Sequence, residues 1–248
     1  MGAGRNIGLT DKQKEDYEAL LIKPNLTPKQ QLDKERLYEK SLCKYEFDLS
    51  ETAKTYIKGL VKEKIFMYDT EVTSKQMEKG ILVEDKAIEL YNSIFFKNYE
   101  KNTIKMHNDF IQGTCDIDAP SKIIDIKSSW TLETFPATKE EGKNEDYEWQ
   151  GRGYMWIYDK PIFELAYCFI DTPDSLLDWE NNLKIHQHIR HFEGDNGKMV
   201  AVPIKEELLV TVLKFERDIE IEEKIKYKVG ECRRFANYYA NQILSKNN

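Results

Sequence analysis

A short hairpin near the middle of the chain constrains the fold more than any other segment. Residues 113–119 and 122–128 have the composition and alternation of short strands. Pro120 and Ser121, which lie between them, are typical of a tight turn. The segment therefore predicts two antiparallel strands whose register is set by the turn.

That register brings two acids face to face. With the turn centred between Pro120 and Ser121, Asp116 stands directly opposite Asp125. Like charges at this separation repel and destabilise a strand pair, so a purely structural role does not account for them. A divalent cation resolves the conflict, because hard oxygen ligands at such a spacing suit Mg²⁺ or Mn²⁺.

A lysine lies beside the two acids. Strand alternation places Lys127 on the same face as Asp125, one pleat along. A cation held by two carboxylates, with an ammonium beside it, is equipped for phosphodiester hydrolysis. Asp118 is a rival for Asp116, since it points to the same face. We rank Asp118 lower as a metal ligand, because the residue opposite it is Ile123.

The rest of the chain reads as helices with a few apolar strands. Thr27 and Ser50 stand at capping positions before two of the helices. The predicted helices cover residues 11–22, 28–43, 50–66, 74–96 and 147–158, and the predicted further strands cover 103–110 and 163–170. Pro173 and Asp174 predict a turn into another helix, and Asp195–Gly197 a hairpin tip. The tail from 204 to 244 reads as helical, with a break near Gly230.

A glutamate interrupts the apolar stripe of the fourth helix. Glu84 lies in the middle of the stripe, where an acid is costly unless it meets a cation or a full set of donors. Gly80, one turn earlier, would let the helix approach the sheet closely. The alternative is a glutamate at the edge of the stripe that reaches solvent. The stripe consists of Met77, Gly80, Ile81, Ala87, Ile88, Tyr91 and Phe95.

A polar pair follows a charged loop. Gln150 and Tyr154 are four residues apart and share one helix face. Taken alone, the pair also fits an ordinary amphipathic helix.

Composition narrows the class of protein. The net charge of −7 argues against a protein that coats nucleic acid, but it does not exclude a nuclease, whose metal-binding carboxylates add to the acidic count. No apolar run is long enough to cross a bilayer. The four cysteines are far apart and read as free thiols. We interpret His186, His188 and His191 as surface residues, since their spacing matches no common ligand pattern.

Together, four short motifs resemble the active-site signature of the PD-(D/E)XK nucleases. The resemblance is to the branch that holds lambda-type exonuclease, the YqaJ-like viral recombinases and the RecB-type nuclease domains. Relatives with an iron–sulfur cluster are set aside, because this chain lacks their clustered cysteines. The motifs, in the expected order, are GILVE (Gly80–Glu84), GTCD (Gly113–Asp116), DIK (Asp125–Lys127) and QGRGY (Gln150–Tyr154).

The resemblance implies a metal site. Asp116 and Asp125 would bind catalytic Mg²⁺ or Mn²⁺, Glu84 would bind it directly or through water, and the carbonyl of Ile126 would complete the shell.

The resemblance also implies roles beside the metal. Lys127 would act on the attacking water, while Gln150 and Tyr154 would position the lysine, the strand or the DNA backbone. The implied fold is α/β: a restriction-endonuclease-like core with a mixed central sheet flanked by helices. We expect a helical N-terminal addition (1–73) packed on a core with a helical tail (74–248), in one compact domain.

The function expected from the resemblance is a double-strand DNA exonuclease of phage-type recombination. It would act on duplex ends in the cytoplasm of a bacterial or phage-infected cell, beside a single-strand annealing protein and as a homo-oligomer, with no membrane partner. Two alternatives stay open. One is a structure- or sequence-directed endonuclease of the same superfamily, and the other is a nonenzymatic DNA-binding or assembly protein on an inactivated nuclease fold.

Overall fold

The computed structural model describes residues 9, 11–42, 47–70, 73–177 and 185–245. The chain divides into two compact units, one of residues 71–223 and one of residues 1–70 together with 224–248. Residues 224–248 thus group with the N-terminal helices. The expectation of a single compact domain with a boundary near residue 73 stays a prediction.

The smaller unit is helical. The threonine before its second helix forms a reciprocal cap, in which Thr27 Oγ1 accepts from Gln30 N and Gln30 Oε1 accepts from Thr27 N. Ser50 caps the third helix by accepting from Ala53 N. Both predicted caps are confirmed. The helices of this unit are α1 (Asp11–Ile22), α2 (Pro28–Leu42), α3 (Glu51–Phe66) and most of α6 (Ile219–Leu244).

The larger unit is built on a mixed sheet with the strand order β3-β4-β5-β8. β3 pairs antiparallel with β4, β4 parallel with β5, and β5 antiparallel with β8. The predicted mixed sheet flanked by helices is therefore confirmed. The strands are β3 (Ile117–Ala119), β4 (Lys122–Lys127), β5 (Ile162–Cys168) and β8 (Val210–Glu216).

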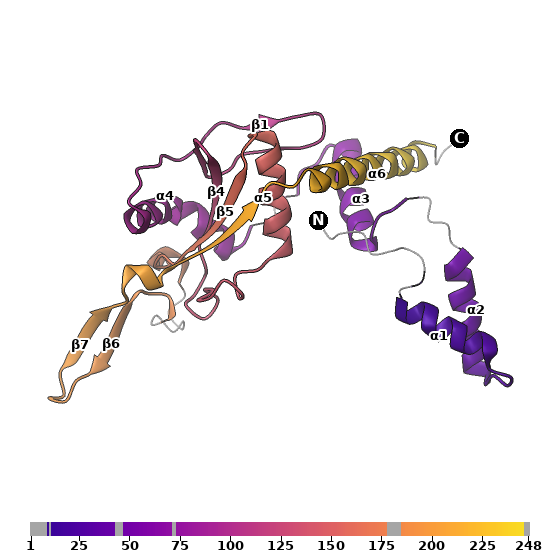
Figure 1. Cartoon of the computed structure of the whole chain (residues 1–248), viewed down its shortest axis with the longest axis horizontal. Coiled ribbons are helices and arrows are strands. Elements are labelled where there is room, and N and C mark those ends of the chain that lie inside the picture. The colour runs from indigo at the N-terminus through magenta and orange to yellow at the C-terminus, as the bar shows by residue number, and fades with distance from the viewer. Residues whose placement is uncertain (1–8, 10, 43–46, 71–72, 178–184, 246–248) are drawn as a thin grey trace. The chain divides into compact units, whose positions relative to one another are not determined.

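One helix covers each face of this sheet (Figure 1). α4 (Lys75–Phe95) packs against Ile124 and Ile126 of β4. α5 (Glu145–Ile157) packs on the opposite face, where Ile123 of the same strand lies. Because side chains alternate along a strand, Asp125 and Lys127 share the α5 face with Ile123.

The predicted register of the central hairpin is confirmed. Ile117 lies opposite Ile124 and Ala119 opposite Lys122, so the turn is centred between Pro120 and Ser121.

The prediction of a helical tail from residue 204 is confirmed for Ile219–Leu244 and wrong for the residues before it. Residues 210–216 form β8, in which Val210 and Val212 face the α4 side while Leu213 and Phe215 face the α5 side. This alternation gives β8 apolar side chains on both faces as the last strand of the sheet. α6 continues through Gly230 without the predicted break, since one glycine in a helix costs only about 1 kcal/mol.

The predicted first strand is also wrong over most of its length. Residues 103–110 contain only the two-residue strand β1 (Met106–His107), which pairs with β2 (Gln112–Gly113). The predicted second hairpin is confirmed as β6 (Ile189–Glu193) and β7 (Met199–Pro203), and it projects from the rest of its unit (Figure 1). Short 3₁₀ turns occur at η1 (Asp174–Leu176) and η3 (Glu206–Leu208).

The apolar stripe predicted on α4 is partly wrong. Met77 and Ile81 are exposed, while Lys79 and Val83 are buried, so the buried face is rotated from the expected one. No atom of the described residues lies within 4 Å of a Cβ built at Gly80, which means that this glycine is not needed for a close approach.

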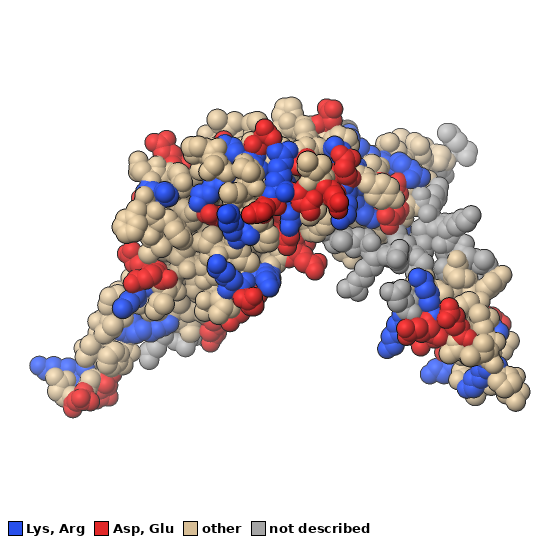
Figure 2. All heavy atoms as spheres, in the orientation of Figure 1, with Lys and Arg blue, Asp and Glu red and all other residues tan. Residues whose placement is uncertain are grey.

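Charge is distributed evenly on the visible surface. In Figure 2, Lys and Arg side chains are interspersed with Asp and Glu rather than gathered into one basic patch. Within the part of the chain that the structure describes, no helix is long and apolar enough to cross a membrane.

Candidate active site

The two predicted metal-binding aspartates come from the central hairpin. Asp125 is in β4, and Asp116 directly precedes β3. The pairing ends at Ile117 with Ile124, and the same register carried one position further would place Asp116 opposite Asp125. Asp116 is tied to this position because its Oδ2 accepts a hydrogen bond from Ile126 N at 2.6 Å.

Both aspartates are held in a setting that disfavours their charge. Asp125 is 2% exposed, and burial raises its pKa. Burial, followed by the charge of Asp125, raises the pKa of Asp116 to about 7, although the hydrogen bond from Ile126 N works in the opposite direction. A site that raises the pKa of two facing carboxylates favours a bound cation.

Lys127 contacts the buried aspartate directly. Its Nζ forms an ion pair with Asp125 Oδ2 at 2.5 Å. Burial works to lower the pKa of Lys127, but Asp125 and Asp116 together outweigh it, so that the pKa is raised. Lys127 therefore carries its charge at neutral pH.

Glu84 lies near the two aspartates but is turned to a different partner. Its charge raises the pKa of both Asp116 and Asp125. Its side chain is 22% exposed, and its Oε2 accepts a hydrogen bond from Lys101 Nζ at 2.7 Å. Among the described residues, no three Asp, Glu, His or Cys side chains come together as a metal-binding cluster.

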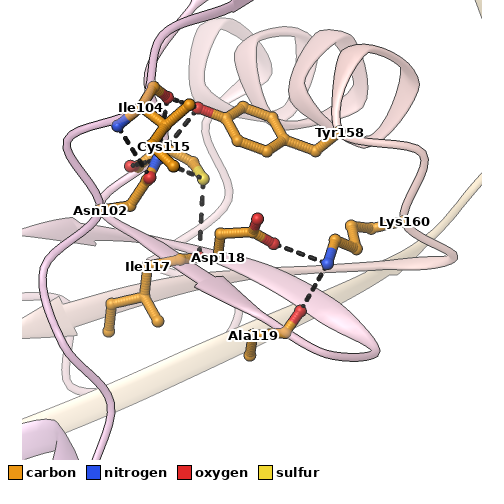
Figure 3. A network of polar contacts seen from close by, with 8 residues as sticks. All are labelled: Asn102, Ile104, Cys115, Ile117, Asp118, Ala119, Tyr158 and Lys160. Carbon is orange, nitrogen blue, oxygen red and sulfur yellow. Dashed lines mark hydrogen bonds and ion pairs between the residues drawn. The ribbon is translucent and has the colours of Figure 1, made fainter.

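The rival aspartate has a structural partner. Asp118 lies opposite Ile123, as predicted, and its Oδ1 pairs with Lys160 Nζ at 2.7 Å (Figure 3). Lys160 Nζ also donates to Ala119 O at 2.9 Å. This pairing accounts for Asp118 without a metal ion and favours Asp116 as the ligand.

An asparagine anchors the strand end that carries Asp116. Asn102 N donates to Asp116 O at 2.7 Å, and Asn102 Nδ2 donates to Cys115 O at 3.0 Å. The same Nδ2 lies 3.0 Å from Tyr158 Oη, whose hydroxyl donates to Ile104 O at 2.5 Å (Figure 3). Sequence reasoning missed Asn102, because it follows the α4 helix in a segment with no periodic pattern.

Gln150 and Tyr154 meet as predicted on one face of α5. Gln150 Nε2 donates to Tyr154 Oη at 2.9 Å. Burial raises the pKa of Tyr154, and the charges of Asp125, Lys127 and Asp116 also act on it, so the hydroxyl lies near the acids. Gly113 makes room for this ring, since a Cβ there would come within 2.3 Å of Tyr154 Cε1.

Two further residues near Lys127 were missed from the sequence. Tyr147, on α5, places its ring under the ammonium, with Lys127 Nζ 4.9 Å from the ring centroid. Lys79 is fully buried in α4 and donates to Ser129 O at 2.5 Å and Trp130 O at 3.3 Å, just beyond β4. Burial lowers the pKa of Lys79 to about 8. A lysine in line with buried Val83, four residues on, was the signal that could have found it.

The histidines take no part in this site. The surface interpretation is wrong for His186, which is 2% exposed and bonded through Nδ1 to Trp130 O and Thr172 Oγ1. His188 pairs with Asp171 at 2.9 Å. Cys115, Cys168 and Cys232 are free thiols, as predicted, and Cys43 lies outside the described residues.

The residues present fit a divalent cation. Two neighbouring carboxylates, Asp116 and Asp125, offer hard oxygen ligands. Burial and the charge of Asp125 raise the pKa of Asp116, and a cation beside the pair would offset that unfavourable charge.

Comparison with solved structures identifies the fold. A phage-related exonuclease from Haemophilus somnus 129PT matches with a TM-score of 0.68 and 23% identity, over 99% of this chain and 98% of that one. An alkaline exonuclease from Laribacter hongkongensis matches with a TM-score of 0.56 and 12% identity, over 79% of this chain and 86% of that one. The same enzyme in complex with dAMP gives the same TM-score at 13% identity. No protein-family model and no curated protein sequence matches the chain.

These likenesses confirm the predicted lambda-exonuclease-like nuclease fold. At such low identity they show the fold alone.

Proposed function

We propose that this chain, which has the fold of phage-type exonucleases, is a metal-dependent DNA nuclease that hydrolyses phosphodiester bonds. One observation carries the proposal: Asp116 and Asp125 lie together at one end of the central hairpin, where Asp116 Oδ2 accepts from Ile126 N and Lys127 pairs with Asp125. A structural protein gains nothing from this arrangement, because facing carboxylates destabilise the strands that bear them.

Asp116 and Asp125 would hold Mg²⁺ or Mn²⁺, with the carbonyl of Ile126 and the carboxylate of Glu84 as further ligands. When bound, the ion would supply Lewis-acid polarisation of the phosphate and a lowered pKa for a nearby water.

The protein groups can orient the nucleophile and stabilise charge. Because its pKa is raised, Lys127 is a donor and not a base: its ammonium can orient the attacking water or stabilise a phosphate oxygen. Tyr154, held by Gln150, would position the lysine or the DNA backbone from α5.

Within this class we favour a double-strand exonuclease. Both solved relatives are exonucleases, and one was solved with a deoxymononucleotide. We extend the proposal to phage-type recombination in the cytoplasm of a bacterial or phage-infected cell, with a single-strand annealing protein as partner and a homo-oligomer as the working form.

The test compares linear and covalently closed duplex DNA of the same sequence. With Mg²⁺ or Mn²⁺ the protein should degrade the linear duplex to mononucleotides, leave closed circles intact, and stop when EDTA is added. Asp125→Asn should abolish the activity, while Asp118→Asn, which removes a carboxylate paired with Lys160, should retain most of it. Cutting of closed circles would favour the endonuclease. An inactive protein whose Asp125→Asn variant binds DNA equally well would favour a nonenzymatic role.

A further inference from the structure

A second lysine reaches the acids from a different segment. Lys101 lies between α4 and β1, and its Nζ is 2.7 Å from Glu84 Oε2 and 3.8 Å from Asp85 Oδ1. Lys101 Nζ donates to Glu84 Oε2 in this contact. The ammonium therefore lies beside the acids at the edge of the site.

The main chain beside Lys101 is fixed to the site. The next residue, Asn102, donates from its backbone N to Asp116 O. Its side chain donates to Cys115 O on the same strand end (Figure 3). Tyr158 Oη closes this anchor from α5. These contacts hold the main chain next to Lys101, while its long side chain keeps its own rotamer freedom.

Glu84 cannot bind Lys101 and a metal ion at full strength at the same time. Its Oε2 is engaged by Lys101, and within the described residues no third acid completes a metal-binding cluster with Asp116 and Asp125. A divalent cation and an ammonium that approach the same carboxylate repel each other. Binding of the metal ion to Glu84 weakens the Lys101 ion pair, and the ion pair weakens metal binding by the same factor.

We propose that Lys101 is a built-in competitor of the divalent cation for Glu84. Its ammonium holds Glu84 Oε2 while no metal is bound, and release of this oxygen would free it to join Asp116 and Asp125. This inference rests on the metal site of the proposed function, and it adds a residue that regulates loading of that site.

The test measures Mn²⁺ affinity by calorimetry on the purified chain without DNA, so that it does not depend on catalysis. Lys101→Met should bind Mn²⁺ more tightly, by about two- to fivefold, as expected for losing a half-exposed ion pair. Lys101→Arg keeps the charge and should resemble the natural chain. Lys86→Met removes an exposed charge from the helix that carries Glu84 and should leave the affinity unchanged.

A double-mutant cycle separates competition at Glu84 from a general effect of charge. In a Glu84→Gln background, Lys101→Met should no longer tighten Mn²⁺ binding. An unchanged or weaker affinity in Lys101→Met, or an equal gain with and without Glu84, would overturn the inference while leaving the nuclease proposal intact. If the natural chain binds no more Mn²⁺ than Asp125→Asn, the metal site itself fails, and the inference fails with it.

Discussion

The ring of Tyr154 lies against the main chain of Gly113, where a Cβ would come within 2.3 Å of Cε1. Gly113 begins the GTCD motif and Tyr154 ends the QGRGY motif, so this contact joins two motifs that are far apart in sequence. Because Gly113 has no side chain, the Tyr154 ring can occupy its position near the acids.

Gly113→Ala should displace the Tyr154 ring and lower both stability and nuclease activity. Overpacking at such a site costs about 1–3 kcal/mol, which urea unfolding would measure. Gly80→Ala is the matched control, since no described atom lies near its Cβ. That change should stabilise the protein by about 0.5–1 kcal/mol, because alanine suits a helix better. Equal effects of the two substitutions would contradict the proposed role of Gly113.

Lys127→Met should reduce the rate of DNA hydrolysis by about 10²–10³-fold, as expected for loss of a preorganised charged donor. Mn²⁺ binding should persist and even tighten, because a cation beside Asp125 has been removed. Single-turnover kinetics and calorimetry would separate the two effects. Loss of Mn²⁺ binding together with activity would show that Lys127 maintains the site rather than acting on the reaction.

Asp116→Asn should stabilise the metal-free protein above pH 7. The folded carboxyl has a pKa of about 7, whereas the unfolded one ionises near 3.8, so the folded state holds the extra proton between these values. The free energy of unfolding therefore falls as pH rises through this window. With EDTA present, the variant should gain on the order of 1–3 kcal/mol over the natural chain at pH 8, and little at pH 4. A variant that is less stable at pH 8 would contradict the raised pKa.

Lys79→Met should destabilise the protein although it removes a buried charge. The ammonium donates to Ser129 O and Trp130 O, and a buried carbonyl that loses its donor costs about 1–3 kcal/mol. Lys86→Met, on the exposed side of the same helix, should change stability by less than about 0.5 kcal/mol. Thermal unfolding of the two variants gives the comparison.

The sequence was most informative where structure depends on near neighbours. The register of the central hairpin follows from its turn alone, and the structure has Ile117 opposite Ile124 as expected. The caps at Thr27 and Ser50 are equally local. Each of these features involves residues within a few positions of one another.

Prediction from the sequence failed where the structure depends on a contact partner that is distant in sequence. Lys79 turns inward because backbone carbonyls some fifty residues later accept its hydrogen bonds, and this rotates the buried face of α4. Residues 210–216 form a strand because β5 offers a free edge. Lys101 contacts Glu84 from seventeen residues away, next to Asn102, whose partner Cys115 is also distant in sequence. None of these partners is visible in a local pattern.

The Pro120-Ser121 turn has a consequence for how the chain tolerates insertions and deletions. β4 is held by its parallel pairing with β5, so a change of one residue in the turn would be taken up by β3. A slip of one position turns every side chain of a strand to the other face, and Asp116 would leave its place opposite Asp125. The turn is therefore free to vary in composition but not in length.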